Sequence, residues 1–377
     1  MSLCKIQARQ PLEIQELDQQ IWQEELSGII PEELFDIHVH VYQRKHIGRN
    51  SPELQAQMFS TLYPSAGWDE LNAADAMLLP DRQIHRLVFG FPFAEVHFEA
   101  LNDFTSKQVR RDSESAALLL VNPGMSADYI EQKVLNQGFM GFKPYRLYTT
   151  SGNALESRIT DFFPEHQIQV ADRYGLLVIL QLSKSRGIGD PDNIADMERL
   201  TAKYPNVCWI MAHCCRGFYP QPLERAGKRL ADLPNVFVDT AAVCEYASYD
   251  YLLSLLGPKR ILYGSDNLPA CADRGKYITW GEGWTHCNAS SLAVGSIPSN
   301  PAMTFILYEV FRALCRAIRR HNLSTSQIQD IFHNNGAALV TGAKERLAQV
   351  SGQTRHGATC GVIARCADSP DRRGVVR

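Results

Sequence analysis

The sequence predicts an α/β protein in which eight parallel strands and the helices between them close into a single (β/α)8, or TIM, barrel. Three observations support this prediction. Eight short apolar segments alternate with helical patterns between residues 34 and 266. Most of these segments are apolar throughout rather than at every second position, which is typical of parallel strands buried on both faces. The length of the region also suits one closed barrel.

A doubly wound open sheet is the alternative architecture. Its dinucleotide-binding form carries a GxGxxG motif directly after the first strand. No such motif follows the first predicted strand here. We therefore prefer the barrel, for which 377 residues are sufficient.

The predicted strands are runs of apolar, often β-branched residues bounded by polar or turn-forming residues. They span residues 34–41, 84–92, 116–123, 139–145, 176–182, 207–214, 235–243 and 260–266.

Helical periodicity fills most of the intervals between the strands. Before the first strand, Ile14, Leu17, Ile21 and Trp22 lie on one face of a helix that we predict over 11–28. After the last strand, an aromatic and glycine-rich loop leads to two C-terminal helices. The other predicted helices span 96–111, 127–136, 161–174 and 192–204, the loop spans 267–300, and the C-terminal helices span 301–320 and 324–334.

The chain is predicted to have three parts. An N-terminal helical extension (1–33) precedes the barrel (34–350), and a tail (351–377) follows it. The tail has five arginines and few large apolar residues, so we expect it to be disordered.

The composition is that of an ordinary globular protein. Apolar residues make up 45%, charged residues 21%, and the formal net charge is -3, which gives no indication of nucleic-acid binding. No segment has the apolar length of a membrane span, and the N-terminal residues lack the apolar core of a secretory signal. The ten cysteines include no CxxC pair and are expected to be buried thiols. We therefore expect a cytoplasmic protein without membrane or nucleic-acid partners.

The first predicted strand carries two histidines, His38 and His40, within ELFDIHVHVYQ (33–43). Because successive side chains of a strand point to opposite faces, the two imidazoles share one face. A metal ion would satisfy both imidazole nitrogens together. Hydrogen bonds to other groups would also satisfy the two imidazoles. The residues at the ends of the other predicted strands are therefore needed to choose between a metal site and ordinary hydrogen bonding.

Polar or ionisable residues end five of the predicted strands. Active sites of (β/α)8 barrels lie at the carboxyl ends of the strands. Such groups are costly to bury without partners. They are satisfied most economically if they share a metal ion or pair with one another. The residues are His38 and His40 on the first strand, Lys143 on the fourth, Gln181 on the fifth, His213 on the sixth and Asp266 on the eighth.

Five segments resemble successive signatures of the amidohydrolase superfamily, specifically its amidohydrolase-related branch. This branch contains metal-dependent hydrolases and non-oxidative decarboxylases similar to aminocarboxymuconate semialdehyde decarboxylase. The resemblance covers residues 34–342 and rests on FDIHVHVY (35–42), GFKPY (141–145), WIMAHCCRG (209–217), ILYGSDNLP (261–269) and IQDIFHNNGAALV (328–340).

The resemblance implies a role for each strand-end residue. His38 and His40 would bind one divalent metal ion, with zinc as the expected ion. Asp266 would complete that site and accept a proton from the metal-bound water. His213 would hold the reacting substrate oxygen or lie near a second metal. Lys143 matches a lysine that is carboxylated and bridges two metals in binuclear relatives, and that is often an ordinary cation in this branch.

One position departs from the family pattern. The family usually has a histidine at the end of the fifth strand, whereas this chain has Gln181 in VILQL (178–182). An amide oxygen is a weaker ligand than imidazole, so the site should hold zinc less tightly or prefer another ion. A barrel that binds a ligand without metal is therefore a further hypothesis.

If the metal is present, hydrolysis is the reaction that we expect. A divalent cation would lower the pKa of a bound water, and Asp266 would take its proton as the water attacks a carbonyl carbon. Decarboxylation of a carboxylated substrate needs nearly the same groups and is the alternative reaction.

Four arginines follow strand ends on the face where ligands bind: Arg146, Arg186, Arg216 and Arg274. Any one of them taken alone would be interpreted as a solvated charge. Together they predict a small anionic substrate, because guanidinium groups bind carboxylate or phosphate in a bidentate manner. The long segment 42–71 is expected to form a lid or a contact in a homo-oligomer.

Two further aspartates lie near these residues. Asp36 precedes the two histidines on the same face of the first strand and is expected to orient a histidine ring. Asp239 ends the seventh strand and is expected to be a buried hydrogen-bond acceptor rather than a catalyst.

Overall fold

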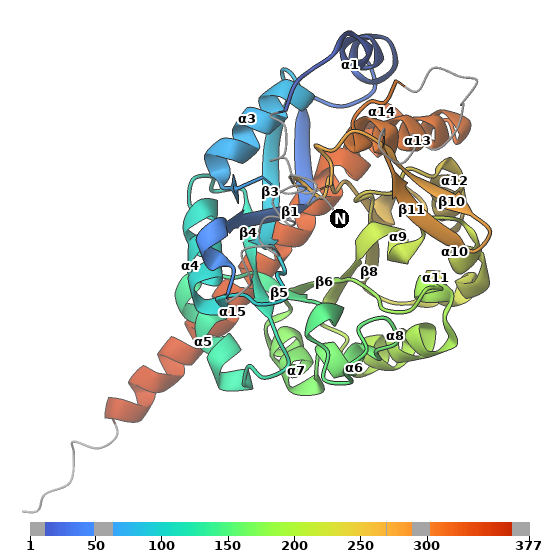
Figure 1. Ribbon diagram of the computed structural model, residues 1–377. Helices are drawn as coiled ribbons and strands as arrows, with labels where there is room; N and C mark the ends of the chain where they lie inside the picture. Colours follow the sequence, from blue (N-terminus) through green and yellow to red (C-terminus); the bar gives the residue numbers. More distant parts are fainter. Residues whose placement is uncertain (1–11, 49–62, 269, 289–301, 364–377) are drawn as a thin grey trace, which may run out of the picture.

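The structure is a computed structural model that describes residues 12–48, 63–268, 270–288 and 302–363. Its centre is a nine-stranded sheet with the strand order β2-β1-β3-β4-β5-β6-β7-β8-β9. Figure 1 shows this sheet curled around the middle of the molecule, with helices on its outer side. The strands are β1 (Glu33–Gln43), β2 (Ser65–Ala66), β3 (Gln83–Gly90), β4 (Ala116–Val121), β5 (Gly141–Pro144), β6 (Leu177–Leu180), β7 (Cys208–Met211), β8 (Val236–Asp239) and β9 (Ile261–Leu262).

Eight of these strands are parallel, and they correspond one to one with the eight predicted strands. The short β2 pairs antiparallel with the end of β1, where Tyr42 faces Ala66. All other neighbouring strand pairs in this sheet are parallel. Each observed strand except β1 is shorter than the predicted apolar run, because residues at the ends of the runs, most of them at the carboxyl ends, leave the ladder.

The chain after β9 returns to β1 and closes the sheet. The Ile37 N–H donates a hydrogen bond to the Tyr263 carbonyl (2.9 Å), and the His40 N–H donates to the Asn267 carbonyl (2.8 Å). In the opposite direction, the Asp266 N–H donates to the His38 carbonyl (3.0 Å). The architecture is therefore the predicted TIM barrel, and an open doubly wound sheet is excluded.

Both faces of the central strands are buried, as the continuous apolar runs predicted. All six residues of β4 are buried, and so are nine consecutive residues of β1 from Leu34 to Tyr42. The outer faces pack against helices and the inner faces fill the barrel. His38 and His40 are thus placed inside the barrel among apolar neighbours, where their polar atoms need specific partners.

The helices agree with the periodic segments, with differences at their ends. The predicted helix 161–174 is divided, because Phe163 precedes Pro164 and a residue before proline avoids the helical conformation. The helices are α1 (Glu16–Ile21), α3 (Trp68–Leu78), α4 (Phe98–Val109), α5 (Ala127–Gln137), α6 (Ile159–Phe162), α7 (Glu165–Tyr174), α8 (Pro191–Lys203), α9 (Ala212–Arg216), α10 (Gln221–Ala226), α11 (Lys228–Asp232), α12 (Tyr246–Leu256), α13 (Ile306–Arg320), α14 (Thr325–Gln329) and α15 (Asn335–Ile363).

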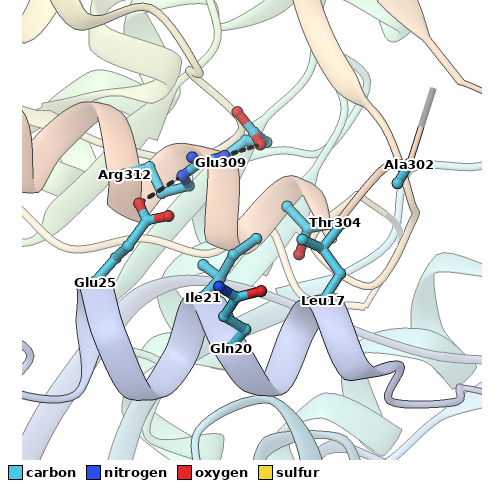
Figure 2. A pocket seen from close by; sticks show the side chains of 8 residues that line it. All are labelled: Leu17, Gln20, Ile21, Glu25, Ala302, Thr304, Glu309 and Arg312. Atoms are coloured by element: carbon cyan, nitrogen blue, oxygen red, sulfur yellow. Dashed lines mark hydrogen bonds and ion pairs between the residues drawn. The ribbon is translucent and has the colours of Figure 1, made fainter. Parts of the chain in front are cut away.

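The N-terminal extension packs against α13. Helix α1 continues into the π-helical turn η1 (Trp22–Leu26). Figure 2 shows side chains of this continuous segment facing Glu309 and Arg312 of α13. The Arg312 guanidinium donates to Glu25 (2.8 Å) and to Glu309 (3.0 Å), so one cation links the extension to the barrel.

The segment after β9 contains a hairpin that the sequence did not predict. Strands β10 (Lys276–Trp280) and β11 (Gly283–Cys287) pair antiparallel within the expected loop 267–300. Five-residue strands joined by a two-residue turn are too short to stand out among glycines and aromatics. Residues 269 and 289–301 lie outside the described part of the chain.

Helix α15 continues past residue 350, where we expected the barrel domain to end, and its end projects away from the barrel (Figure 1). The remainder of the predicted disordered tail, 364–377, lies outside the described residues, as does the middle of the predicted lid, 49–62. Among the described helices, none combines the length and the apolar character needed to cross a bilayer. Seven cysteines whose side chains the structure describes are buried thiols, as predicted.

Candidate metal centre

Three of the predicted ligands meet at the mouth of the barrel. One ligand atom from each of His38, His40 and Asp266 lies within 4.8 Å of the other two. Oδ1 of Asp266 is 3.1 Å from Nε2 of His40 and 3.6 Å from Nε2 of His38. Both imidazoles are buried, with exposed fractions of 0% for His38 and 2% for His40. Residues far apart in the sequence thus form one compact set of donors.

The backbone after β9 brings Asp266 to the histidines. Gly264 lies so close to β1 that a Cβ atom at this position would be 3.0 Å from the Cβ of His38, which explains the glycine in the YGSD sequence. Asp266 itself has a left-handed backbone conformation (φ 60°), which non-glycine residues seldom adopt. Its N–H is held by the His38 carbonyl, so this strained conformation is fixed by the same strand that carries the ligands.

Asp239 orients His38. One carboxylate oxygen of Asp239 is 2.8 Å from Nδ1 of His38, and the other accepts the backbone N–H groups of His213 (2.7 Å) and Ala241 (3.1 Å). An ionised carboxylate only accepts, so Nδ1 of His38 carries the proton and Nε2 presents its lone pair. That lone pair faces the Asp266 carboxylate and has no hydrogen-bond partner. Two electron-rich atoms that face each other in a buried site repel each other unless a proton, a water molecule or a cation lies between them.

Asp36 has a different role from the one that we expected. It accepts the backbone N–H of His38 (3.1 Å) and that of Ser265 (2.9 Å). Asp36 therefore joins β1 to the segment after β9 and does not bond a histidine ring. Burial raises the pKa of Asp36 to about 7. The ring is oriented by Asp239, which the sequence identified as a buried acceptor without revealing its partner, because the two residues are 201 positions apart.

The protonation states of the three donors suit a cation. Burial lowers the pKa of His38 and of His40, so both imidazoles are neutral at neutral pH. Burial alone would raise the pKa of Asp266, but its hydrogen bond with His40 and the surrounding imidazoles outweigh burial and hold this pKa below the ordinary value. Neutral imidazole and ionised carboxylate are the forms that bind metals.

Lys143 lies on β5 near this set and is completely buried. Its Nζ has no hydrogen-bond partner and stands over the rings of Tyr145 (4.5 Å) and Phe89 (5.0 Å). Burial lowers the pKa of Lys143 to about 7. The buried carboxylate of Asp239 and the partly exposed carboxylate of Asp266 are therefore opposed by the Lys143 amine, whose own charge is costly at this place.

His213 is placed by an unusual turn directly after β7. Four consecutive residues, His213 to Arg216, have positive φ angles of 56°, 51°, 60° and 62°. A left-handed turn costs free energy for each non-glycine residue, and such strain is concentrated at functional sites. Nδ1 of His213 lies 3.0 Å from the Ala241 carbonyl, so it donates this bond and leaves Nε2 as an acceptor.

Gln181 provides the partner for that acceptor. Its amide nitrogen is 3.3 Å from Nε2 of His213 and donates a hydrogen bond to it. Gln181, which stands where the family usually has a histidine, thus holds His213 by this hydrogen bond. His213 itself is not among the three residues whose ligand atoms converge.

The four predicted arginines are not equivalent. The pKa of Arg216 is lowered to about 10, mainly by burial and to a smaller extent by the charge of Arg146. The two guanidinium groups therefore lie close enough to influence each other. The Nε atoms of both are buried without a hydrogen-bond partner, and no carboxylate of the described residues pairs with either side chain. Arg186 is exposed.

Arg274 anchors the N-terminal extension. Its guanidinium contacts both carboxylate oxygens of the buried Asp18, at 3.0 and 2.5 Å, and also the Glu13 and Met303 carbonyls. Its face covers the Phe305 ring at 4.2 Å. Because an intramolecular carboxylate already binds both Nη atoms of Arg274, we do not include this residue among the proposed substrate-binding groups.

Comparison with known proteins agrees with this architecture. The model of the amidohydrolase family matches residues 35–341. Among proteins with curated descriptions, no sequence matches the chain significantly.

Solved structures with a similar fold are only distantly related in sequence. A 5-carboxyvanillate decarboxylase from Novosphingobium aromaticivorans, solved with bound manganese and a nitrobenzoic acid, is 12% identical with a TM-score of 0.51, and the match covers 83% of this chain and 97% of that chain. A 2,6-dihydroxybenzoate decarboxylase in complex with 2,6-dihydroxybenzoate is 11% identical with a TM-score of 0.51, over 82% of this chain and 100% of that chain. These similarities establish a shared fold.

Proposed function

The chain belongs to the amidohydrolase family, and from this membership and its cluster of His38, His40 and Asp266 we propose that it is a metal-dependent hydrolase of a small anionic carbonyl compound. One observation carries the proposal: the unprotonated Nε2 of His38 faces the Asp266 carboxylate in a buried site and lacks a hydrogen-bond partner. A bound cation is the simplest group that satisfies both atoms.

The proposed cofactor is one divalent cation held by the two imidazoles and the carboxylate. When bound, such a cation makes a water molecule more acidic and polarises a carbonyl oxygen. Zinc suits imidazole ligands, whereas manganese suits a site with more oxygen donors. A second cation would require carboxylation of Lys143, and we propose that Lys143 acts here as a free amine.

Asp266 is the proposed general base. It is ionised at neutral pH, since its pKa lies below the ordinary value. It accepts a proton from the attacking water and returns that proton to the leaving group. His213 is proposed to hold the reacting substrate oxygen by donating from a protonated Nε2, in place of the bond that this atom accepts from Gln181, while the Ala241 carbonyl keeps the ring oriented through Nδ1.

Arg146 and Arg216 are the proposed binding groups for the anionic part of the substrate. Both have buried N–H donors without partners, and no carboxylate of the described residues neutralises them. A substrate carboxylate would supply the missing negative charge and accept two parallel hydrogen bonds from a guanidinium edge. The exposed Arg186 would contribute at most long-range attraction.

Non-oxidative decarboxylation is the second candidate reaction. It is favoured by the same pair of unneutralised arginines and by the buried amine of Lys143, because all three suit a substrate that carries a carboxylate. The relatives with the same fold that are named above are decarboxylases of aromatic acids.

The test is a parallel assay of the purified, metal-loaded protein on amides, lactones and aromatic carboxylates. Release of acid identifies hydrolysis, and release of carbon dioxide identifies decarboxylation. Either activity should disappear with a chelator and return with a divalent cation.

We expect Asp266→Asn to bind metal at saturating concentration but to have no measurable turnover. If metal-loaded Asp266→Asn protein had wild-type turnover, Asp266 would not be the general base. A protein that binds carboxylates equally well without metal would instead be a non-catalytic binding barrel.

A further inference from the structure

The β10–β11 hairpin places an aromatic side chain against one of the two unneutralised arginines. The guanidinium carbon of Arg216 lies 5.5 Å from the centroid of the Trp284 ring. Trp284 belongs to β11 and is half-buried. The tip of the hairpin is itself tied to α10 by an ion pair between Glu282 and Arg225.

Trp284 is held in place by further rings. Phe218 stacks on it with ring centroids 3.9 Å apart and an interplanar angle of 20°. Phe218 also stacks on His213, with ring centroids 5.7 Å apart and an interplanar angle of 27°. Tyr277, on the adjacent strand β10, contacts both Phe218 (5.3 Å) and Trp284 (5.6 Å). The rings of His213, Phe218 and Trp284 therefore form one stack that leads from the proposed reaction centre to Arg216.

The polar contacts of Arg216 are few for a buried cation. Its exposed fraction is 9%. Nη1 makes one long hydrogen bond, 3.4 Å, to the Leu182 carbonyl, and Nε has no partner. The second cation, Arg146, adds repulsion. Within the described residues, the Trp284 ring is thus the principal favourable contact of this guanidinium.

The kind of contact matters for what Arg216 can bind. A guanidinium that lies on an aromatic ring uses its face for the cation–π interaction. Its in-plane N–H groups stay free, and these are the groups that bind a carboxylate in a bidentate manner. An arginine paired with an acidic side chain would have lost those donors.

We propose that Trp284 is a positioning residue that holds the Arg216 guanidinium on its indole face and so prepares its edge for a substrate carboxylate. This inference rests on the proposed role of Arg216 in binding the anionic part of the substrate. It assigns the hairpin a part in substrate selection, whereas the metal ligands lie on β1 and after β9.

The experiment measures binding of two probes to the full-length protein loaded with manganese or zinc, by titration calorimetry. The probes are 2,6-dihydroxybenzoate and resorcinol, which has the same ring and hydroxyl groups without the carboxylate. In Trp284→Leu we expect the dissociation constant of 2,6-dihydroxybenzoate to rise by about tenfold, the order of one desolvated cation–π contact, and that of resorcinol to stay unchanged. Trp284→Phe should recover part of the loss.

Trp280→Leu is the matched control, because Trp280 lies on the same hairpin but is 63% exposed. It should bind both probes as the wild type does. Metal content and melting temperature of every variant are measured alongside, so that a folding defect is recognised.

The outcomes separate this inference from the proposed function. If Arg216→Met weakens 2,6-dihydroxybenzoate binding and Trp284→Leu does not, the role of Trp284 is wrong and the carboxylate site stands. If Trp284→Leu weakens both probes equally, Trp284 only supports the pocket and the inference is overturned. If the wild type does not distinguish the two probes, or Arg216→Met binds like the wild type, the carboxylate site fails and the inference fails with it.

Discussion

At the scale of single residues, the site depends on which atom of each donor faces the others. Asp239 determines the tautomer of His38 and thereby makes Nε2 the free atom. Gln181 acts differently on His213, because it donates to Nε2 and so occupies that atom. Both residues act through a histidine, so their effect on chemistry should be indirect and measurable.

Asp239→Asn should weaken metal binding by roughly 10- to 100-fold, because an amide no longer fixes the His38 proton on Nδ1 as a carboxylate does. Competition with a coloured chelator measures this affinity. Asp128→Asn, an exposed aspartate on α5, is the control and should bind metal normally. A metal affinity of Asp239→Asn equal to that of the wild type would mean that His38 is oriented by other contacts.

The sequence predicted the three residues that cluster at the mouth of the barrel but could not identify all of their partners. The period of two within the first strand was sufficient to place His38 and His40 on one face, because that inference is local. The pairing of His38 with Asp239 joins positions far apart and needs the closed barrel. The same holds for Arg274, whose place after a strand end resembled that of Arg216 although its partner, Asp18, lies in the N-terminal extension.

At the scale of elements, most of the fold was predictable, because each strand has an apolar run and most helices show helical periodicity in the sequence. The eight strands were found in order. The hairpin β10–β11 was missed, because its strands are only half-buried and carry no continuous apolar run. The left-handed turn after β7 was also missed, since AHCCR contains no glycine that would signal positive φ angles.

The N-terminal extension should depend on the Arg274–Asp18 pair. Arg274→Ala leaves the fully buried Asp18 carboxylate without its cation, so the free energy of unfolding should fall by about 3 kcal/mol. Chemical denaturation measures this loss, with the exposed Arg320→Ala as control. Metal content and carboxylate affinity should be unchanged. Loss of carboxylate affinity in the folded variant would restore the substrate-binding role that the structure argues against.

Helices α7 and α8 are joined through Glu165, which bonds Lys203, Tyr204 and Arg199. These bonds lower the pKa of Glu165 from 4.5 to about 2. A depressed pKa means that the stabilisation is complete above pH 4.5 and is lost as the pH falls towards 2. Glu165→Gln should therefore cost about 1 kcal/mol at pH 7 and progressively less below pH 4.5. Denaturation curves at several pH values test this, and a cost independent of pH would contradict it.

At the scale of the whole molecule, the proposed metal ligands come from β1 and from the segment after β9, which are the two sides of the barrel closure. A cation at this place would therefore link the first and last strands. Unfolding separates these segments, so metal binding and folding should be coupled.

Addition of a divalent cation at 100 times its dissociation constant should stabilise the protein by about 2.7 kcal/mol, which corresponds to a rise of about 3 °C in Tm for a chain of this size. Differential scanning calorimetry with and without chelator measures the shift. His38→Ala should abolish it, because one of three ligands is removed. A shift of the same size in His38→Ala would place the stabilising ion elsewhere.

The central claim is that His38, His40 and Asp266 hold one divalent cation. Anomalous diffraction from crystals of the metal-loaded protein, recorded at the absorption edge of the added ion, tests it most directly. The account predicts a single peak at bonding distance from Nε2 of His38, Nε2 of His40 and a carboxylate oxygen of Asp266. A peak elsewhere, or no peak in a protein that is nevertheless active, would contradict it.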